Sequence, residues 1–141
     1  MAGFSPQLEA RLKELWGTPV NLYRALGNHP GLVAAWTEFA NAIRHDSRTP
    51  RALRELMILR TAQIARSEYE WAQHVIIARL AGISDEEIRR VRMGPDAPGW
   101  SRADAALLRA VDELHRDACI ADPTWSALRE RYGDEELIDL V

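Results

Sequence analysis

Apolar residues recur at helical spacing along almost the whole chain, and this periodicity limits the possible folds more than any other feature. One stripe with spacings of three and four residues consists of Leu32, Ala35, Trp36, Phe39 and Ile43. No stretch alternates polar and apolar residues over more than a few positions, as a half-buried strand would. The pattern therefore predicts an all-α protein, built as a helical bundle.

Capping residues, prolines and glycines predict where the helices begin and end. Helices are expected over about residues 5–17, 19–27, 30–45, 50–65, 67–81 and 84–92, with others beginning at residues 101, 122 and 134. Ser84 and Glu87 match a capping box, and Gly82 suits the left-handed residue after a helix. With 141 residues and no linker, the chain is expected to form a single domain over 1–141. Its last helix has room for only about two turns, so we expect this helix to be truncated.

Composition argues against several classes of protein. A formal net charge of −3 at pH 7 gives no reason to expect nucleic acid as a partner. No run of about 18 residues is apolar throughout, so no membrane partner is expected and the protein is interpreted as soluble and cytoplasmic. The only cysteine, Cys119, excludes an internal disulfide and a Cys-x-x-Cys redox pair. We expect this side chain to be buried as a small hydrophobic group.

The stretch from Pro50 to Gly82 contains the candidate chemistry. Glu70 and His74 lie one helical turn apart, on the same side as Ser67 and Trp71. A carboxylate beside an imidazole favours the charged ring and fixes which nitrogen carries the proton, which is one way to build an acid/base pair. Glu55, on the preceding antiparallel helix, is placed to add a second carboxylate. The alternative interpretation is a pair on a solvated helix face, a common arrangement.

The order of Glu55, then SEYEWAQH over residues 67–74, then Gly82 and SDEEI resembles the carboxymuconolactone decarboxylase family, which includes the AhpD-like alkyl hydroperoxidases. The segment NLYRALGNHPGLVAAWTEF, which begins at Asn21, is similar to the one that precedes the motif in many members. The resemblance implies the AhpD-like helical fold. It also implies a homo-oligomer, a trimer or hexamer, and the apolar stripes on nearly every helix favour the same prediction.

AhpD-like members carry a Cys-x-x-Cys-x-x-x-His motif and an upstream glutamate that serves in a proton relay. In that pattern Ser67 and Glu70 stand at the cysteine positions, His74 at the histidine and Glu55 at the glutamate. Neither a hydroxyl nor a carboxylate can cycle through a disulfide, so the AhpD-like peroxidase reading is disfavoured. The remaining Glu-x-x-x-His form resembles the decarboxylase branch, which implies acid/base chemistry on a small carboxylate or lactone with no cofactor.

The candidate catalytic residues are therefore Glu55, Glu70 and His74, at the mouth of a pocket, with His74 transferring the proton. Residues expected to contact the substrate are Trp71, Tyr69 and Arg60. The alternative for Arg60 is a structural pair with Glu70, and of these two roles the sequence favours the pair. No metal site is expected, because His74 has only Glu70 near it on its helix. The competing hypothesis is a non-catalytic oligomeric protein that binds a small acid.

Overall fold

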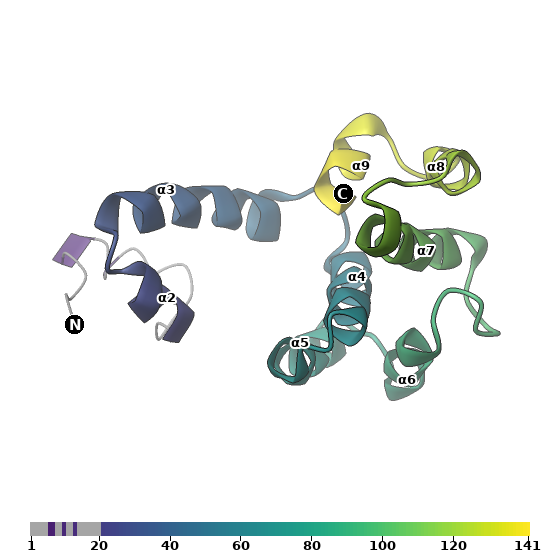
Figure 1. Cartoon of the computed structure of the whole chain (residues 1–141), viewed down its shortest axis with the longest axis horizontal. Coiled ribbons are helices and arrows are strands. Elements are labelled where there is room, and N and C mark those ends of the chain that lie inside the picture. The colour runs from purple at the N-terminus through teal and green to yellow at the C-terminus, as the bar shows by residue number, and fades with distance from the viewer. Residues whose placement is uncertain (1–5, 8–9, 11–12, 14–20) are drawn as a thin grey trace. The chain divides into compact units, whose positions relative to one another are not determined.

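The computed structural model describes residues 6–7, 10, 13 and 21–141, and its chain divides into two compact units, residues 1–47 and 48–141. Every regular element in the described part of the chain is a helix, which confirms the all-α prediction (Figure 1). The helix expected over 5–17 lies largely outside the described residues. The expectation of one domain stays a prediction, and each unit is described by itself.

The first unit contains helices α2 (Asn21–Leu26) and α3 (Pro30–Asn41), and α3 continues into a π-helical turn, η1 (Ala42–Asp46). His29 caps α3, since its Nδ1 accepts a hydrogen bond of 3.1 Å from the backbone N–H of Leu32. Tyr23 and Val33 form the buried contact between the two helices.

The apolar stripe expected on α3 does not form the buried face of that helix. Leu32, Phe39 and Ile43 are exposed, whereas the residues buried on α3 are Val33, Thr37 and Ala40. Trp36 of the stripe packs beside Tyr23, but the side of α3 that is fully buried against α2 is the one that carries Val33.

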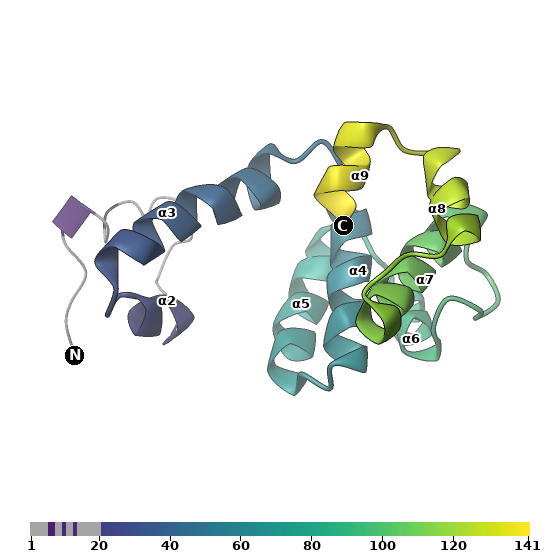
Figure 2. The same cartoon turned by 45° about the horizontal axis from the view of Figure 1, so that its top comes forward.

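The second unit holds six helices: α4 (Arg51–Ile64), α5 (Glu68–Leu80), α6 (Asp85–Met93), α7 (Arg102–Asp117), α8 (Asp122–Arg129) and α9 (Asp134–Leu140). Helix α4 lies between α5 and α7 (Figures 1 and 2). Apolar residues on two of its sides explain this position, because Met57 belongs to a core with α7, α8 and α9, while Leu59 belongs to a core with α5 and α6.

The predicted caps of this unit are present. Ser84 and Glu87 form the capping box of α6, and Gly82 adopts a φ of 91°, which a glycine does without strain. Trp100 fixes the loop before α7, since its indole Nε1 donates a 3.1 Å hydrogen bond to the carbonyl of Gly94.

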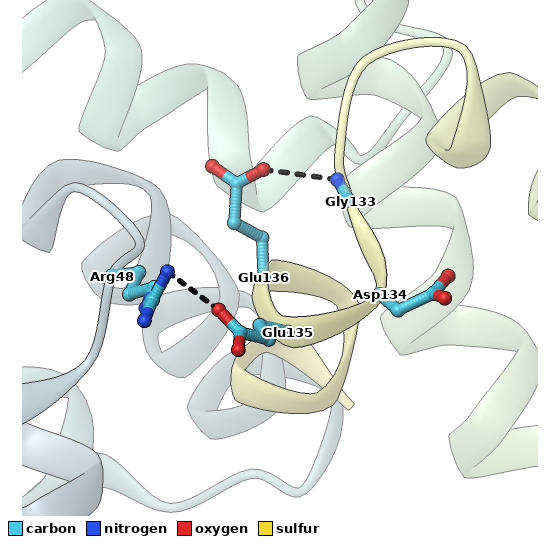
Figure 3. A pocket seen from close by; sticks show the side chains of 5 residues that line it. All are labelled: Arg48, Gly133, Asp134, Glu135 and Glu136. Atoms are coloured by element: carbon cyan, nitrogen blue, oxygen red, sulfur yellow. Dashed lines mark hydrogen bonds and ion pairs between the residues drawn. The ribbon is translucent and has the colours of Figure 1, made fainter.

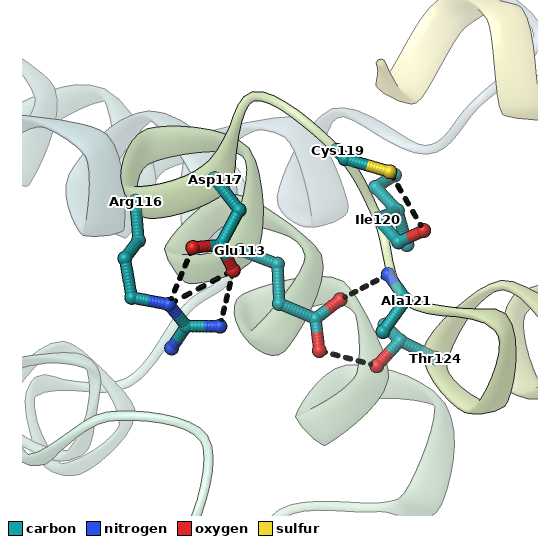
Figure 4. A network of polar contacts seen from close by, with 7 residues as sticks. All are labelled: Glu113, Arg116, Asp117, Cys119, Ile120, Ala121 and Thr124. Atoms are coloured by element: carbon teal, nitrogen blue, oxygen red, sulfur yellow. Dashed lines mark hydrogen bonds and ion pairs between the residues drawn. The ribbon is translucent and has the colours of Figure 1, made fainter.

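A buried glutamate joins α7 to α8 (Figure 4). The two carboxylate oxygens of Glu113 accept hydrogen bonds of 2.9 Å from the backbone N–H of Ala121 and from the hydroxyl of Thr124. Alanine at the N-cap of α8 has no side-chain acceptor, so Glu113 supplies the cap from the neighbouring helix.

Cys119 lies in the same connection, and the expectation that it is buried is wrong. Its side chain is exposed, after a left-handed residue, Ala118, that ends α7. The small hydrophobic character that usually buries a free cysteine has no core to join at this turn.

Among the described helices none is long and apolar enough to cross a membrane.

Candidate active site

The candidate site is built on the antiparallel pair α4 and α5. The chain reverses in a tight turn over residues 65–67, where Arg66 has a φ of 55° and the Ser67 hydroxyl caps α5. A short connection keeps the helices adjacent, so a residue early in α4 faces a residue two turns into α5.

Glu55 and His74 face each other across this pair. His74 Nδ1 lies 2.7 Å from Glu55 Oε2, and both residues are buried, with 9% and 4% of their surface exposed. A carboxylate at this distance accepts a hydrogen bond from Nδ1–H, which leaves Nε2 as the ring nitrogen that faces away from Glu55. Burial of His74 contradicts the solvated-face interpretation of the Glu70–His74 pair for the histidine, whereas Glu70 itself is half exposed. The burial also replaces the expected position at a pocket mouth with one inside the fold.

Glu70 contacts the other side of the same ring. Its Oε2 lies 3.5 Å from His74 Nε2, and its side chain is 51% exposed. The imidazole therefore lies between two carboxylates, one buried and close, the other at the surface and looser. Such an arrangement can pass a proton between the ring and solvent.

Arg60 is not part of this cluster. Its Nε and one terminal nitrogen bind the Asp112 carboxylate at 2.6 and 2.7 Å, and its other terminal nitrogen donates to the carbonyl of Val91. The expected pairing with Glu70 is wrong, and with its donors directed at Asp112 and Val91 the guanidinium ties α4 to α6 and α7. Asp112 lies 52 residues away along the chain, beyond the reach of a local spacing argument.

The two aromatic candidates of α5 are in different environments. Trp71 is partly buried against the core of α4, α5 and α6, and the guanidinium of Arg92 lies 4.2 Å from the centre of its ring. Tyr69 is 62% exposed, and no hydrogen bond or ring contact within the described residues joins it to His74. No local spacing predicts the contact with Arg92, because this residue comes from the end of α6.

Other polar clusters of the described chain lie away from His74. Arg48 bridges to Glu135 at 2.6 Å beside an open cavity at the start of α9, where the backbone N–H of Gly133 donates to Glu136 (Figure 3). These contacts fasten α9 to the segment before α4. The described residues contain no group of three or more histidine, cysteine, aspartate or glutamate side chains that could hold a metal ion.

Comparison with known proteins identifies the family. The model of the carboxymuconolactone decarboxylase family matches residues 30–113, more than half of the chain. The chain belongs to the carboxymuconolactone decarboxylase family. The matched region contains the whole of α4, α5 and α6, and therefore Glu55, Glu70 and His74. A search of curated proteins found no match.

Solved structures show that this carboxymuconolactone decarboxylase family member has an AhpD-like fold. One is a protein of unknown function from Agrobacterium tumefaciens, described in relation to the antioxidant defence protein AhpD. It has a TM-score of 0.71 and 24% identity, over 87% of this chain and 83% of that one. Another is the alkylhydroperoxidase AhpD core of an uncharacterized peroxidase-related protein from Ralstonia eutropha JMP134. It has a TM-score of 0.74 and 20% identity, over 95% of this chain and 72% of that one.

Proposed function

We propose that this member of the family is an acid/base enzyme that needs no cofactor and moves a proton at a carbon next to a carbonyl of a small carboxylate or lactone. The observation that supports the proposal is the buried 2.7 Å contact between Glu55 and His74. It orients the ring and assigns the Nδ1 proton, so that Nε2 is the atom that exchanges a proton with the substrate.

Decarboxylation of a β-keto acid illustrates the chemistry. The C–C bond to the carboxylate breaks, carbon dioxide leaves, and the bonding pair moves into the adjacent carbonyl to form an enolate. Protonated Nε2 of His74 then delivers its proton to the α carbon, which restores the ketone. Glu70, half exposed and 3.5 Å from Nε2, returns a proton from water to the ring. Lactone opening or double-bond isomerisation would use the same groups.

Peroxide reduction through a disulfide has no support in the sequence. The chain contains one cysteine, so a peroxidatic thiol and a resolving thiol cannot both be present in it. Ser67, at one of the two cysteine positions of the AhpD-like pattern, is instead the cap of α5.

Solvent exchange tests the proposal without knowledge of the natural substrate. A panel of β-keto acids and unsaturated lactones is incubated with the protein in heavy water, and deuterium at the α carbon is measured by NMR. We expect His74→Gln to lower the exchange rate by about 10²–10⁴ and Glu70→Gln to lower it less. His115→Gln, the same change at an exposed position of α7, is the control.

Two outcomes would contradict the proposal. Exchange at the wild-type rate in His74→Gln would remove the histidine from the chemistry. Absence of exchange across the whole panel, together with saturable binding of its acids, would favour the non-catalytic binding protein.

A further inference from the structure

A second polar cavity lies at the turn between α4 and α5, at the opposite end of the helix pair from Glu55. Its volume is about 480 Å³, and the charged and aromatic groups that line it are Arg66, Glu68, Trp71 and Arg92. The Ser67 hydroxyl also lines the cavity. The set combines two cations, one from the turn before α5 and one from α6, with a hydroxyl and an indole, and these are polar and apolar groups that can orient a small organic acid.

The two arginines differ from most others in the described chain in having no carboxylate partner. Ion pairs engage the guanidinium groups of Arg60, Arg79 and Arg129, each with an aspartate. No ion pair or side-chain hydrogen bond within the described residues involves Arg66 or Arg92. Glu68 lines the same cavity but lies beyond ion-pair distance of both.

The surroundings of Arg66 and Arg92 leave their guanidinium N–H groups available to bind an anion. The Cζ of Arg92 lies over the Trp71 ring, 4.2 Å from its centre, and within the described residues no ion pair or side-chain hydrogen bond occupies its N–H groups, which can bind an oxyanion. Arg66 adopts a φ of 55°, a region that glycine enters more easily than any other residue. The turn alone would therefore favour glycine at this position, which has no side chain to offer a ligand.

We propose that this cavity binds one carboxylate of a small organic acid, with Arg66 and Arg92 as its cationic partners, Ser67 as a hydroxyl donor and Trp71 against the apolar body. Two arginines and one glutamate give the lining a net charge of +1, which matches a single carboxylate. The charge on Glu68 disfavours a second anionic group at the same place.

The assignment of this anion as the substrate rests on the proposed function. Ser67 and His74 lie on one side of α5, two turns and therefore about 10 Å apart along the helix axis. A carboxylate held near Ser67 is then separate from the group that reacts at His74. The substrate class is an acid whose reacting carbon lies several bonds away from the carboxylate that binds.

Calorimetric titration with benzoate, and with its neutral isostere benzamide, tests the cavity without any need for turnover. We expect benzoate to bind and benzamide to bind at least tenfold more weakly. Arg92→Gln and Arg66→Gly should each weaken benzoate binding about tenfold, whereas Glu68→Gln should strengthen it. Arg89→Gln, an equal loss of charge at an exposed position of the same helix as Arg92, should leave binding unchanged.

Arg66→Gly separates binding from folding, because glycine suits the left-handed turn. Its midpoint of thermal unfolding should not fall, so weaker binding by this variant supports the site. Benzoate binding of wild-type strength in both Arg66→Gly and Arg92→Gln would overturn the inference, as would failure of the wild-type protein to bind benzoate at millimolar concentration. Benzoate binding without α-carbon exchange for any acid in the panel would support the cavity and contradict the proposed function.

Discussion

Arg51 lies one turn before Glu55 and places its Nε 3.6 Å from Oε1, the carboxylate oxygen that His74 does not contact. The two oxygens of Glu55 are thus divided between a cation near the surface and the buried imidazole. The arginine side chain is 56% exposed, so its contact is screened by solvent, whereas the contact with His74 is shielded. We therefore assign the orientation of the ring to Glu55, with Arg51 as a minor partner.

Glu55→Gln tests this division. The amide keeps an acceptor for the Nδ1 proton but loses the charge, so we expect α-carbon exchange to fall about 10²–10⁴-fold. The free energy of unfolding should fall by about 1–3 kcal/mol, because a buried hydrogen bond to a charged group is weakened. Arg51→Gln is the comparison and should change the exchange rate no more than a few-fold. A loss of exchange in Arg51→Gln as large as that in Glu55→Gln would contradict the assignment of Arg51 as a minor partner.

Arg60 should prove structural. Its bidentate pair with Asp112 is mostly shielded from solvent, so Arg60→Ala leaves a carboxylate without its partner and should cost about 2–4 kcal/mol in urea unfolding. Arg60→Lys should recover only part of this loss, because an ammonium group cannot form the same fork. The exchange rate per folded molecule should stay unchanged. A folded Arg60→Lys protein that had lost exchange would return Arg60 to the substrate site.

The capping box of α6 should make stability depend on pH in the acidic range. Hydrogen bonds from the hydroxyl and backbone N–H of Ser84 lower the pKa of Glu87 below the ordinary glutamate value. A lowered carboxyl pKa stabilises the fold fully above the pKa of the unfolded chain, about 4.3, and this contribution disappears as the pH falls through the folded value.

Glu87→Gln retains the hydrogen-bonding shape without the charge and isolates this effect. Wild-type protein should exceed this variant by about 0.5–1 kcal/mol in unfolding free energy at pH 6, and the two should converge below pH of about 4. In a Ser84→Ala background the advantage at pH 6 should shrink. A difference in unfolding free energy between wild type and Glu87→Gln that stays constant from pH 6 to 3 would contradict a stabilising role for the charge on Glu87.

The exposed thiol should be chemically accessible and dispensable. Cys119 should react with a thiol reagent in the native protein as fast as in unfolded protein, because no packing covers it. Cys119→Ser should change the free energy of unfolding by less than about 0.5 kcal/mol and leave exchange intact. Loss of exchange in this variant, with the fold preserved, would link the thiol to the site.

Self-association should involve the outer face of α5. Tyr69, Ile76 and Leu80 follow one another at helical spacing and are exposed, Leu80 by 85%. We expect a trimer or hexamer by light scattering, and Leu80→Glu should shift the mass toward a monomer. Ser126→Glu, on an exposed position of α8, should not. A wild-type monomer at micromolar concentration would contradict this expectation.

The contacts of His74 with Glu55 and Glu70 could be predicted from the sequence because they depend on local geometry. Glu70 and His74 are one turn apart on α5. The short connection at residues 65–67 returns α5 beside α4, so that Glu55 of α4 lies level with His74 along the helix pair. The helices with strong caps were predicted for the same reason, since the signals of Ser84 and Gly82 act within a few residues.

Features that depend on distant partners could not be predicted in the same way. Arg60 had a plausible anion near it on α5, but Asp112 on α7 is its real partner. The contact of Arg92 with Trp71 needs the position of α6 relative to α5, which no spacing contains. Phe39 lies on the apolar stripe of α3 but is exposed, because the stripe alone does not determine which side of α3 packs against α2.

The hydrogen bonds from Ala121 and Thr124 to Glu113 affect local unfolding of α7 and α8. With alanine at its N-cap, α8 depends on a carboxylate from α7 for its first backbone donor. Whenever α7 loosens, α8 loses that acceptor, and whenever α8 unwinds, a buried carboxylate loses both of its donors. Local openings of the two helices are therefore coupled, and the amide protons of the first turn of α8 should exchange with solvent together with those around Glu113 as one cooperative unit.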